Sequence, residues 1–229
     1  MARQLTFDLA GPPASARADF LVTAANRDTL AMLDRPEIWP RGRLLLLGAK
    51  GSGKSHIARF WAAENGALRQ AASGLRIEAL DGVVPQDGAL VIENAHRLGT
   101  AAGAEQAMFH LANLAEERSC LLLLTALRPP RDWGIILPDL RSRMESLTTV
   151  ELAAPDEALL PAVLVKLFAD RQIAISPEIV DYLALRMDRD LDLARRLVAA
   201  IDMAALADHK AITRRLAAEW LDKLFEPDA

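Results

Sequence analysis

The sequence has one cysteine and few aromatic residues. A single cysteine, Cys120, cannot form a disulfide within the chain, which fits a reducing compartment. Because Cys120 stands in the apolar run Cys120–Leu124, we expect a small buried residue rather than a nucleophile. Aromatic residues make up 5% of the chain, and its four tryptophans follow no regular spacing. The tryptophans are therefore expected in the core or at interfaces, not in a stacking platform for bases.

The chain also lacks an excess of basic residues and any long apolar run. Its 27 Lys and Arg residues against 31 Asp and Glu residues give a net charge of −4. This balance argues against nonspecific coating of nucleic acid, although it leaves room for a local basic patch. No apolar run approaches the ~18 residues of a membrane span, and the N-terminus has no signal-peptide pattern. We therefore expect a cytoplasmic protein with no membrane partner.

Short apolar runs alternate with helical periodicity up to about residue 152. Continuous apolar runs predict buried strands, and the alternating pattern near residue 150 predicts an edge strand. The expected strands are Arg43–Leu47, Ala67–Ala71, Arg76–Leu80, Ala89–Ile92, Cys120–Thr125 and Leu147–Leu152. Helices are expected after the plausible N-cap Asn26, after a glycine-rich loop, over residues 104–118 and from Pro138.

After Pro155 the strand pattern stops. The segments near 156–170, 177–187, 190–207 and 213–225 are all helical in period. Strands alternating with helices, followed by helices alone, predict an α/β domain with a parallel sheet and a small all-helical domain behind it. We expect a flexible segment over residues 1–19, the α/β nucleotide-binding domain over residues 20–154 and the helical domain over residues 155–229.

A glycine-rich segment follows the apolar run Leu44–Leu47 and precedes an apolar-periodic helix. Its sequence, Gly48-Ala49-Lys50-Gly51-Ser52-Gly53-Lys54-Ser55, has the order and spacing of a P-loop. In such a loop, N–H groups at a helix N-terminus cradle phosphates, the lysine reaches the β- and γ-phosphates, and the following hydroxyl binds Mg²⁺. The residues expected to contact a nucleotide here are Gly48, Gly51, Ser52, Gly53, Lys54, Ser55 and His56.

An acidic residue ends the next strong strand. Glu93 comes directly after Ala89–Ile92 and is followed by Asn94. In P-loop proteins an acidic residue at this place holds the magnesium shell and polarises water. The sequence therefore predicts a site for ATP or ADP with Mg²⁺, the ion being held by Ser55 and, partly through water, by Glu93.

The N-terminal stretch Gln4-Leu5-Thr6-Phe7-Asp8-Leu9 has a glutamine followed by spaced apolar residues. Such a peptide can dock in an extended form on a partner, with its side chains filling pockets. An N-terminal strand that packs on the domain is the alternative. The residues alone do not decide between the two.

Together these segments resemble the AAA+ ATPases, and within them the DnaA type. The matching segments are the P-loop Gly48–Ser55, the acidic strand end Leu90–Asn94, the sensor segment Thr125–Pro130, an arginine-finger box at Leu137–Met144 and a second sensor at Arg189–Asp192. The resemblance covers nearly the whole chain. It implies that the helical domain is a lid and that Arg189 contacts the nucleotide. It also implies that Arg143 is the arginine finger, with Arg141 as the second candidate.

The resemblance extends to Gln4–Leu9, which is similar to the peptide that docks on the bacterial DNA sliding clamp. An AAA+ core of DnaA type with this peptide, and without a DNA-binding domain, implies a regulator. It would dock on the clamp through Gln4, Leu5, Phe7 and Leu9, stimulate ATP hydrolysis by the initiator DnaA and so prevent re-initiation of replication. The implied partners are the clamp, DnaA and a second copy of the chain, with DNA met only through the clamp.

Two residues depart from the DnaA pattern. Asn94 stands where a second acidic residue is expected, and Leu127 stands where the first sensor has a polar residue. Asparagine cannot act as a base and leucine cannot orient a water molecule, so we expect weak hydrolysis of the chain's own nucleotide. The alternatives are a helicase-loader-like ATPase that acts on single-stranded DNA, and an adaptor that joins clamp and partner without a catalytic contribution.

Overall fold

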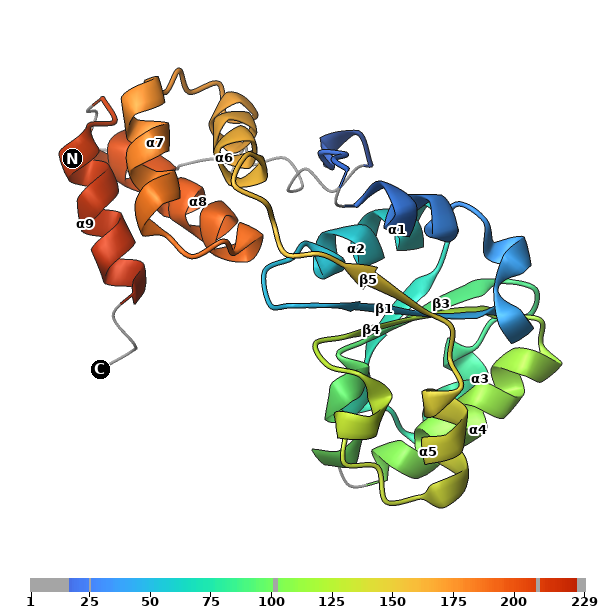
Figure 1. Ribbon diagram of the computed structural model, residues 1–229. Helices are drawn as coiled ribbons and strands as arrows, with labels where there is room; N and C mark the ends of the chain where they lie inside the picture. Colours follow the sequence, from blue (N-terminus) through green and yellow to red (C-terminus); the bar gives the residue numbers. More distant parts are fainter. Residues whose placement is uncertain (1–16, 25, 101–102, 209–210, 226–229) are drawn as a thin grey trace, which may run out of the picture.

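The computed structural model describes residues 17–24, 26–100, 103–208 and 211–225. They form a parallel sheet with helices on both faces and a second domain made of helices only (Figure 1). The expected docking peptide Gln4–Leu9 lies outside the described residues. Within the described part of the chain, no helix is both long and apolar enough to cross a membrane.

Over these residues the sheet has five strands, all parallel, in the order β2-β3-β4-β1-β5. They are β1 Arg43–Gly48, β2 Leu68–Ala71, β3 Ala89–Glu93, β4 Leu121–Ala126 and β5 Thr149–Leu152. The three central strands are buried, as their continuous apolar runs predicted, and β5 lies at the edge. Because the strands run the same way, their carboxyl ends meet at one edge, where the P-loop begins. The predicted α/β P-loop fold is confirmed.

Helices cover both faces of the sheet. One face carries α1 (Arg27–Leu33) and α2 (Lys54–Glu64), and the other carries α3 (Leu80–Val83), α4 (Ala104–Glu117) and α5 (Pro138–Glu145) (Figure 1). Under α1 and α2 the rings of Trp39 and Trp61 stack with their centroids 5.4 Å apart. Both indole N–H groups donate to carbonyl oxygens of α1, at Met32 and Leu33, so this core also satisfies its polar atoms.

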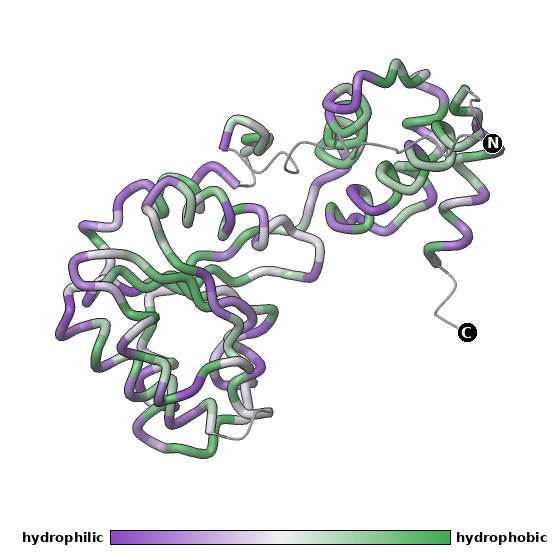
Figure 2. Tube along the Cα trace, turned by 180° about the vertical axis from the view of Figure 1, so that it is seen from behind, coloured by the Kyte–Doolittle hydropathy of each residue, from purple (hydrophilic) through white to green (hydrophobic). Residues whose placement is uncertain are grey.

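The second domain is a bundle of helices with a core of its own. It contains α6 (Leu159–Ala169), α7 (Pro177–Arg186), α8 (Leu191–Asp208) and α9 (Arg214–Phe225). Leu164, Phe168, Leu183 and Leu197 are fully buried between these helices. Figure 2 shows the same division, with hydrophobic residues along the strands of the first domain and inside the bundle of the second.

The predicted strand Arg76–Leu80 is wrong. This stretch forms a 3-10 turn, Ile77–Ala79, that leads into the short helix α3. Leu80 and Val84 are four residues apart and both buried, which is the spacing of a helix face. The segment packs against α4 below the sheet and adds no strand.

Two expectations near the N-terminus also need correction. Asn26 stands at the start of α1, but its side chain accepts the N–H of Thr23 and donates to the carbonyl of Leu21. It therefore fixes the preceding chain and does not cap the helix. Residues 17–19, expected to be flexible, form a 3-10 turn whose Arg17 pairs with carboxylates at Asp34 and Glu64.

Candidate nucleotide-binding site

The P-loop lies between β1 and α2, at the carboxyl edge of the sheet. A Cβ atom on Gly48 would come within 2.7 Å of the Leu152 carbonyl oxygen in β5, so no side chain fits there. Gly51 and Gly53 have φ angles of 71° and 100°, a region that favours glycine. Helix α2 begins directly after Gly53, so its unpaired first N–H groups face the loop.

Lys54 is the first residue of α2 and is buried. Its ammonium group donates to the carbonyl oxygen of Ala49, 2.6 Å away, and to the hydroxyl of Ser52, 3.3 Å away. Burial lowers the pKa of Lys54, and the Asp192 and Asp190 carboxylates of the helical domain oppose that shift. The lysine thus folds back over the loop and lies within the field of two carboxylates from the start of α8.

The first turn of α8 rests on the P-loop. The N–H of Leu191 donates to the carbonyl oxygen of Gly51 over 2.9 Å. A carboxylate oxygen of Asp190 accepts the N–H groups of Asp192 and Leu193, so Asp190 caps α8. A Cβ atom on Gly51 would lie 2.3 Å from Asp190 Cγ and 2.6 Å from its Cα. The helical domain therefore contacts the P-loop directly.

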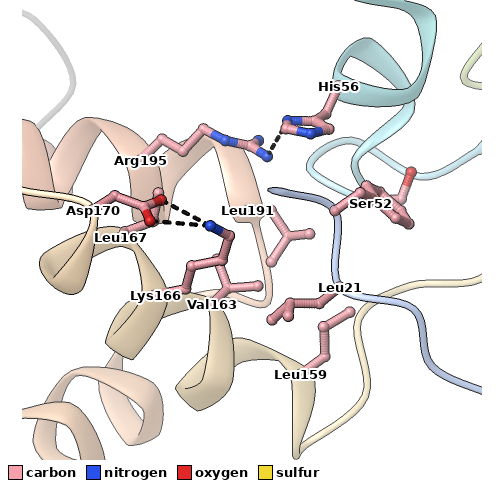
Figure 3. A pocket seen from close by; sticks show the side chains of 11 residues that line it. Leu21, Ser52, His56, Leu159, Val163, Lys166, Leu167, Asp170, Leu191 and Arg195 are labelled. Atoms are coloured by element: carbon pink, nitrogen blue, oxygen red, sulfur yellow. Dashed lines mark hydrogen bonds and ion pairs between the residues drawn. The ribbon is translucent and has the colours of Figure 1, made fainter. Parts of the chain in front are cut away.

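A second contact joins α8 to α2. Arg195 Nη2 lies 2.9 Å from Nδ1 of the buried His56, and Arg195 Nη1 lies 3.2 Å from Asp192 (Figure 3). Burial lowers the pKa of Arg195, while the Asp192 carboxylate opposes the change. On the other side of His56, the ring of Phe20 lies 5.6 Å away, centroid to centroid.

These residues surround a cavity of about 40 Å³ (Figure 3). Phe20 and Ser52 line it from the first domain, and α6 and α8 close it from the helical domain. On its α6 side, Lys166 and Asp170 form an ion pair of 3.0 Å.

Glu93 ends β3 and is held by an arginine of β2. Its Oε1 accepts from Nη2 and Nε of Arg69, over 2.6 and 2.8 Å. The following residue, Asn94, has a φ of 57° and donates its backbone N–H to the hydroxyl of Thr125. Among the described residues, no three His, Cys, Asp or Glu side chains form a metal site. Ser55 and Glu93 fit a magnesium ion only if a bound nucleotide supplies further oxygen ligands.

Leu127 stands where the resemblance implied a polar first-sensor residue. Its side chain is 43% exposed, and its backbone N–H donates to Nδ1 of His96 over 3.3 Å. This bond requires His96 Nδ1 to be unprotonated. Burial lowers the pKa of the His96 imidazole below its ordinary value of 6.5, and the positive charges of Arg128, Arg97 and Lys54 act in the same direction.

Arg189 directly precedes Asp190, which contacts the P-loop, but the Arg189 side chain has another partner. Its guanidinium forms an ion pair of 2.7 Å with Glu157, and it lines a surface groove of the helical domain, not the cavity. Arg195 is the lid arginine that faces α2. We did not identify Arg195 from the sequence. The sequence does contain a signal for it: Arg195 follows Leu191 by four residues, so both lie on the same face of α8.

Arg143 lies on α5 and is held by two residues of α4. Its Nη1 donates to the side-chain oxygen of Asn113, and its Cζ lies 5.1 Å from the centre of the Phe109 ring. Arg141 is instead committed to its own segment, because Nε and Nη2 both donate to the carbonyl oxygen of Ile135. Of the two finger candidates, Arg143 is the one fixed by a neighbouring helix.

Comparison with solved structures assigns the fold. Domain III of Thermotoga maritima DnaA matches 94% of this chain and 99% of its own, with a TM-score of 0.77 and 18% identity. A DnaA bound to AMPPCP and single-stranded DNA matches 83% of this chain and 65% of its own, with a TM-score of 0.67 and 18% identity. The Thermotoga maritima RuvB branch migration motor matches 92% of this chain and 72% of its own, with a TM-score of 0.68 and 18% identity.

These likenesses show that the chain has the AAA+ P-loop fold. Within that class, the fold is of the DnaA type. No protein-family model matches the chain, and no curated protein sequence does.

The contact between Gly51 and α8 predicts the effect of a small substitution. In Gly51→Ala the new methyl group would overlap Asp190, backbone included, at a φ that disfavours alanine. We expect the first turn of α8 to leave the loop, so that hydrogen exchange of the Leu191 amide rises at least about tenfold. The control is Gly74→Ala, where a Cβ meets nothing within 4 Å. Equal protection of Leu191 in both variants would contradict the contact.

The environment of His96 predicts a pH effect on stability. Its folded-state pKa is lowered, so as the pH falls below about 6.5 the unfolded chain binds a proton before the folded chain does. The free energy of unfolding therefore decreases on acidification. In His96→Gln the amide oxygen can accept the Leu127 N–H without titrating. Urea denaturation at pH 7.5 and 5.5 should show a smaller decrease for this variant, and an equal decrease would exclude the assignment.

Proposed function

We propose that this chain is a nucleotide-binding regulator similar to Hda. It docks on the DNA sliding clamp and stimulates ATP hydrolysis by DnaA, which prevents re-initiation of replication. The observation that carries this proposal is the position of Arg143, which is fixed at a distance from the chain's own P-loop.

Arg143 lies near the opposite end of β1 from the nucleotide loop. Its charge is close enough to Arg43, the first residue of β1, to lower the pKa of that guanidinium, alongside the larger effect of burial. The P-loop follows Gly48, the last residue of the strand, and six residues of strand span roughly 17 Å. Helix α5 also covers the face of the sheet opposite α2 (Figure 1). This placement supports an arginine that acts on a nucleotide in another protein.

The chemistry expected of such an arginine is electrostatic. A guanidinium beside the γ-phosphate stabilises the charge that develops on its oxygens in the transition state. Arginine fingers supplied in trans contribute about 10³–10⁵ in rate, or roughly 4–7 kcal/mol. The ring of Phe109 and the amide of Asn113 limit the motion of Arg143, so less entropy is lost when it engages the phosphate.

The chain's own P-loop would hold ADP or ATP with Mg²⁺ in a structural role. Gly48, Gly51 and Gly53 shape the loop, and the DnaA structure with AMPPCP supports nucleotide binding by this fold. Three features support weak intrinsic hydrolysis: Glu93 is neutralised by Arg69, Asn94 cannot act as a base, and Leu127 is apolar. When bound, a nucleotide adds phosphate charge between the loop and α8, where Lys54 and Arg195 can pair with it.

The first experiment measures hydrolysis of DnaA-bound ATP in the presence of the DNA-loaded clamp. Arg143→Ala should lower the stimulated rate by about 10³-fold or more, because the transition-state charge no longer has a partner. Arg143→Lys should recover only part of it, since lysine lacks the fork geometry.

Arg141→Ala is the matched control and should stimulate as the parent chain does. Full stimulation by Arg143→Ala would reject the finger. A rapid DNA-stimulated ATPase of the isolated chain would instead favour the helicase-loader alternative.

The second experiment concerns the N-terminal peptide. Gln4→Ala should weaken the complex with the purified sliding clamp by about tenfold, because a docked glutamine fills a pocket and pairs with its polar groups. The control is Gln86→Ala, an exposed glutamine in a loop of the first domain. If both variants bind the clamp as tightly as the parent chain, Gln4 does not dock.

A further inference from the structure

The only tyrosine of the chain is enclosed by two arginines. Tyr182 lies on α7, and the Cζ of Arg186, one turn later, is 4.4 Å from the ring centre. The Cζ of Arg214, the first residue of α9, is 4.6 Å from the same centre. We refer to Tyr182, Arg186 and Arg214 as the arginine–tyrosine cluster.

The arginines of this cluster have no carboxylate partner among the described residues. Other arginines of the same domain do, with Arg171 paired to Asp202 and Arg189 paired to Glu157. A guanidinium that contacts an aromatic ring keeps N–H donors directed outward in its plane. Arg186 and Arg214 therefore combine a fixed position with donors that can bind an anion.

The helix ends strengthen the positive charge at this place. Arg214 and Arg215 occupy the first turn of α9, which contains no acidic residue. This is the positive end of the helix dipole, where anions are stabilised and cations are not. Glu219, one turn further on, is committed to Lys223 over 2.8 Å. Arg186, Arg214 and Arg215 thus bring three positive charges to one end of α7 and the start of α9, on helices that also carry Glu178, Asp181 and Asp222.

We propose that the arginine–tyrosine cluster binds the phosphate backbone of DNA. Each Cζ lies within 4.6 Å of one ring centre, so the two are at most about 9 Å apart, a distance that spans neighbouring phosphates of a strand. Neither the cavity nor the surface groove described above includes Tyr182, Arg186 or Arg214. Repeated cationic donors without a side-chain pocket suit a uniform polyanion better than a peptide.

The location of the cluster is compatible with the other sites. Helices α7 and α9 lie on the side of the helical domain away from the sheet (Figure 1). DNA bound there leaves the P-loop and Arg143 uncovered. A direct contact also modifies the expectation that DNA is met only through the clamp. It would be weak and salt-dependent, in the range of about 10⁻⁴–10⁻⁶ M that is typical of nonspecific binding.

The test measures fluorescence anisotropy of a labelled 20-base-pair duplex, and of a single strand of the same length, with the full chain at 50–200 mM NaCl. Arg186→Ala/Arg214→Ala should weaken binding at 50 mM by at least about tenfold. It should also reduce the slope of log K against log salt by about 0.9 for each duplex phosphate that the variant no longer neutralises. Arg186→Lys/Arg214→Lys keeps the charge and should retain most of the affinity.

The matched control is Arg27→Ala/Arg196→Ala, which removes the same charge from exposed sites elsewhere. If this control weakens binding as much, or if the parent chain does not bind DNA at 50 mM NaCl, the proposal is wrong. Competition by polyglutamate as effective as that by unlabelled DNA would also overturn it, in favour of an acidic polypeptide. The assay contains neither the clamp nor DnaA, and Arg143→Ala should bind DNA as the parent chain does. The result is therefore independent of the proposed regulator function.

Discussion

The hydrogen bond from Leu191 to Gly51 joins the two domains at the nucleotide loop. It forms only because Gly51 has no side chain, so the capped first turn of α8 can approach the backbone of the loop. The contact between Arg195 and His56 and the closure of the cavity by α8 both follow from this approach. The closest backbone contact between the domains is therefore one that a single methyl group would block.

The sequence was sufficient to predict those parts of the fold whose signal is local. Continuous apolar runs located β1, β3 and β4, and the glycine spacing located the P-loop, because burial and turn geometry act on neighbouring residues. The prediction of a strand at Arg76–Leu80 was wrong because the apolar residues of this segment belong to a helical turn that packs against α4. Arg195 was not identified and the pairing of Arg189 with Glu157 was not foreseen, because partners such as His56 and Glu157 come from distant segments.

Several cationic groups of the molecule lie on separate surfaces. The P-loop and its lysine lie at the carboxyl edge of the sheet, whereas Arg143 lies near the amino end of β1 beside Arg43. The arginines around Tyr182 belong to the far side of the helical domain. A chain that is acidic on average therefore presents cationic groups at well-separated places, each with its own supporting residues.

The edge strand β5 has a mechanical consequence. The chain leaves the sheet through β5, where the Leu152 carbonyl lies against Gly48, and later returns to the same loop through Leu191. The helical domain is thus joined to the sheet by the chain that follows β5, and to the P-loop by the hydrogen bond from Leu191. Because these two connections lie close to Gly48 and Gly51, we expect a change in the shape of the P-loop to alter the tilt of the helical domain.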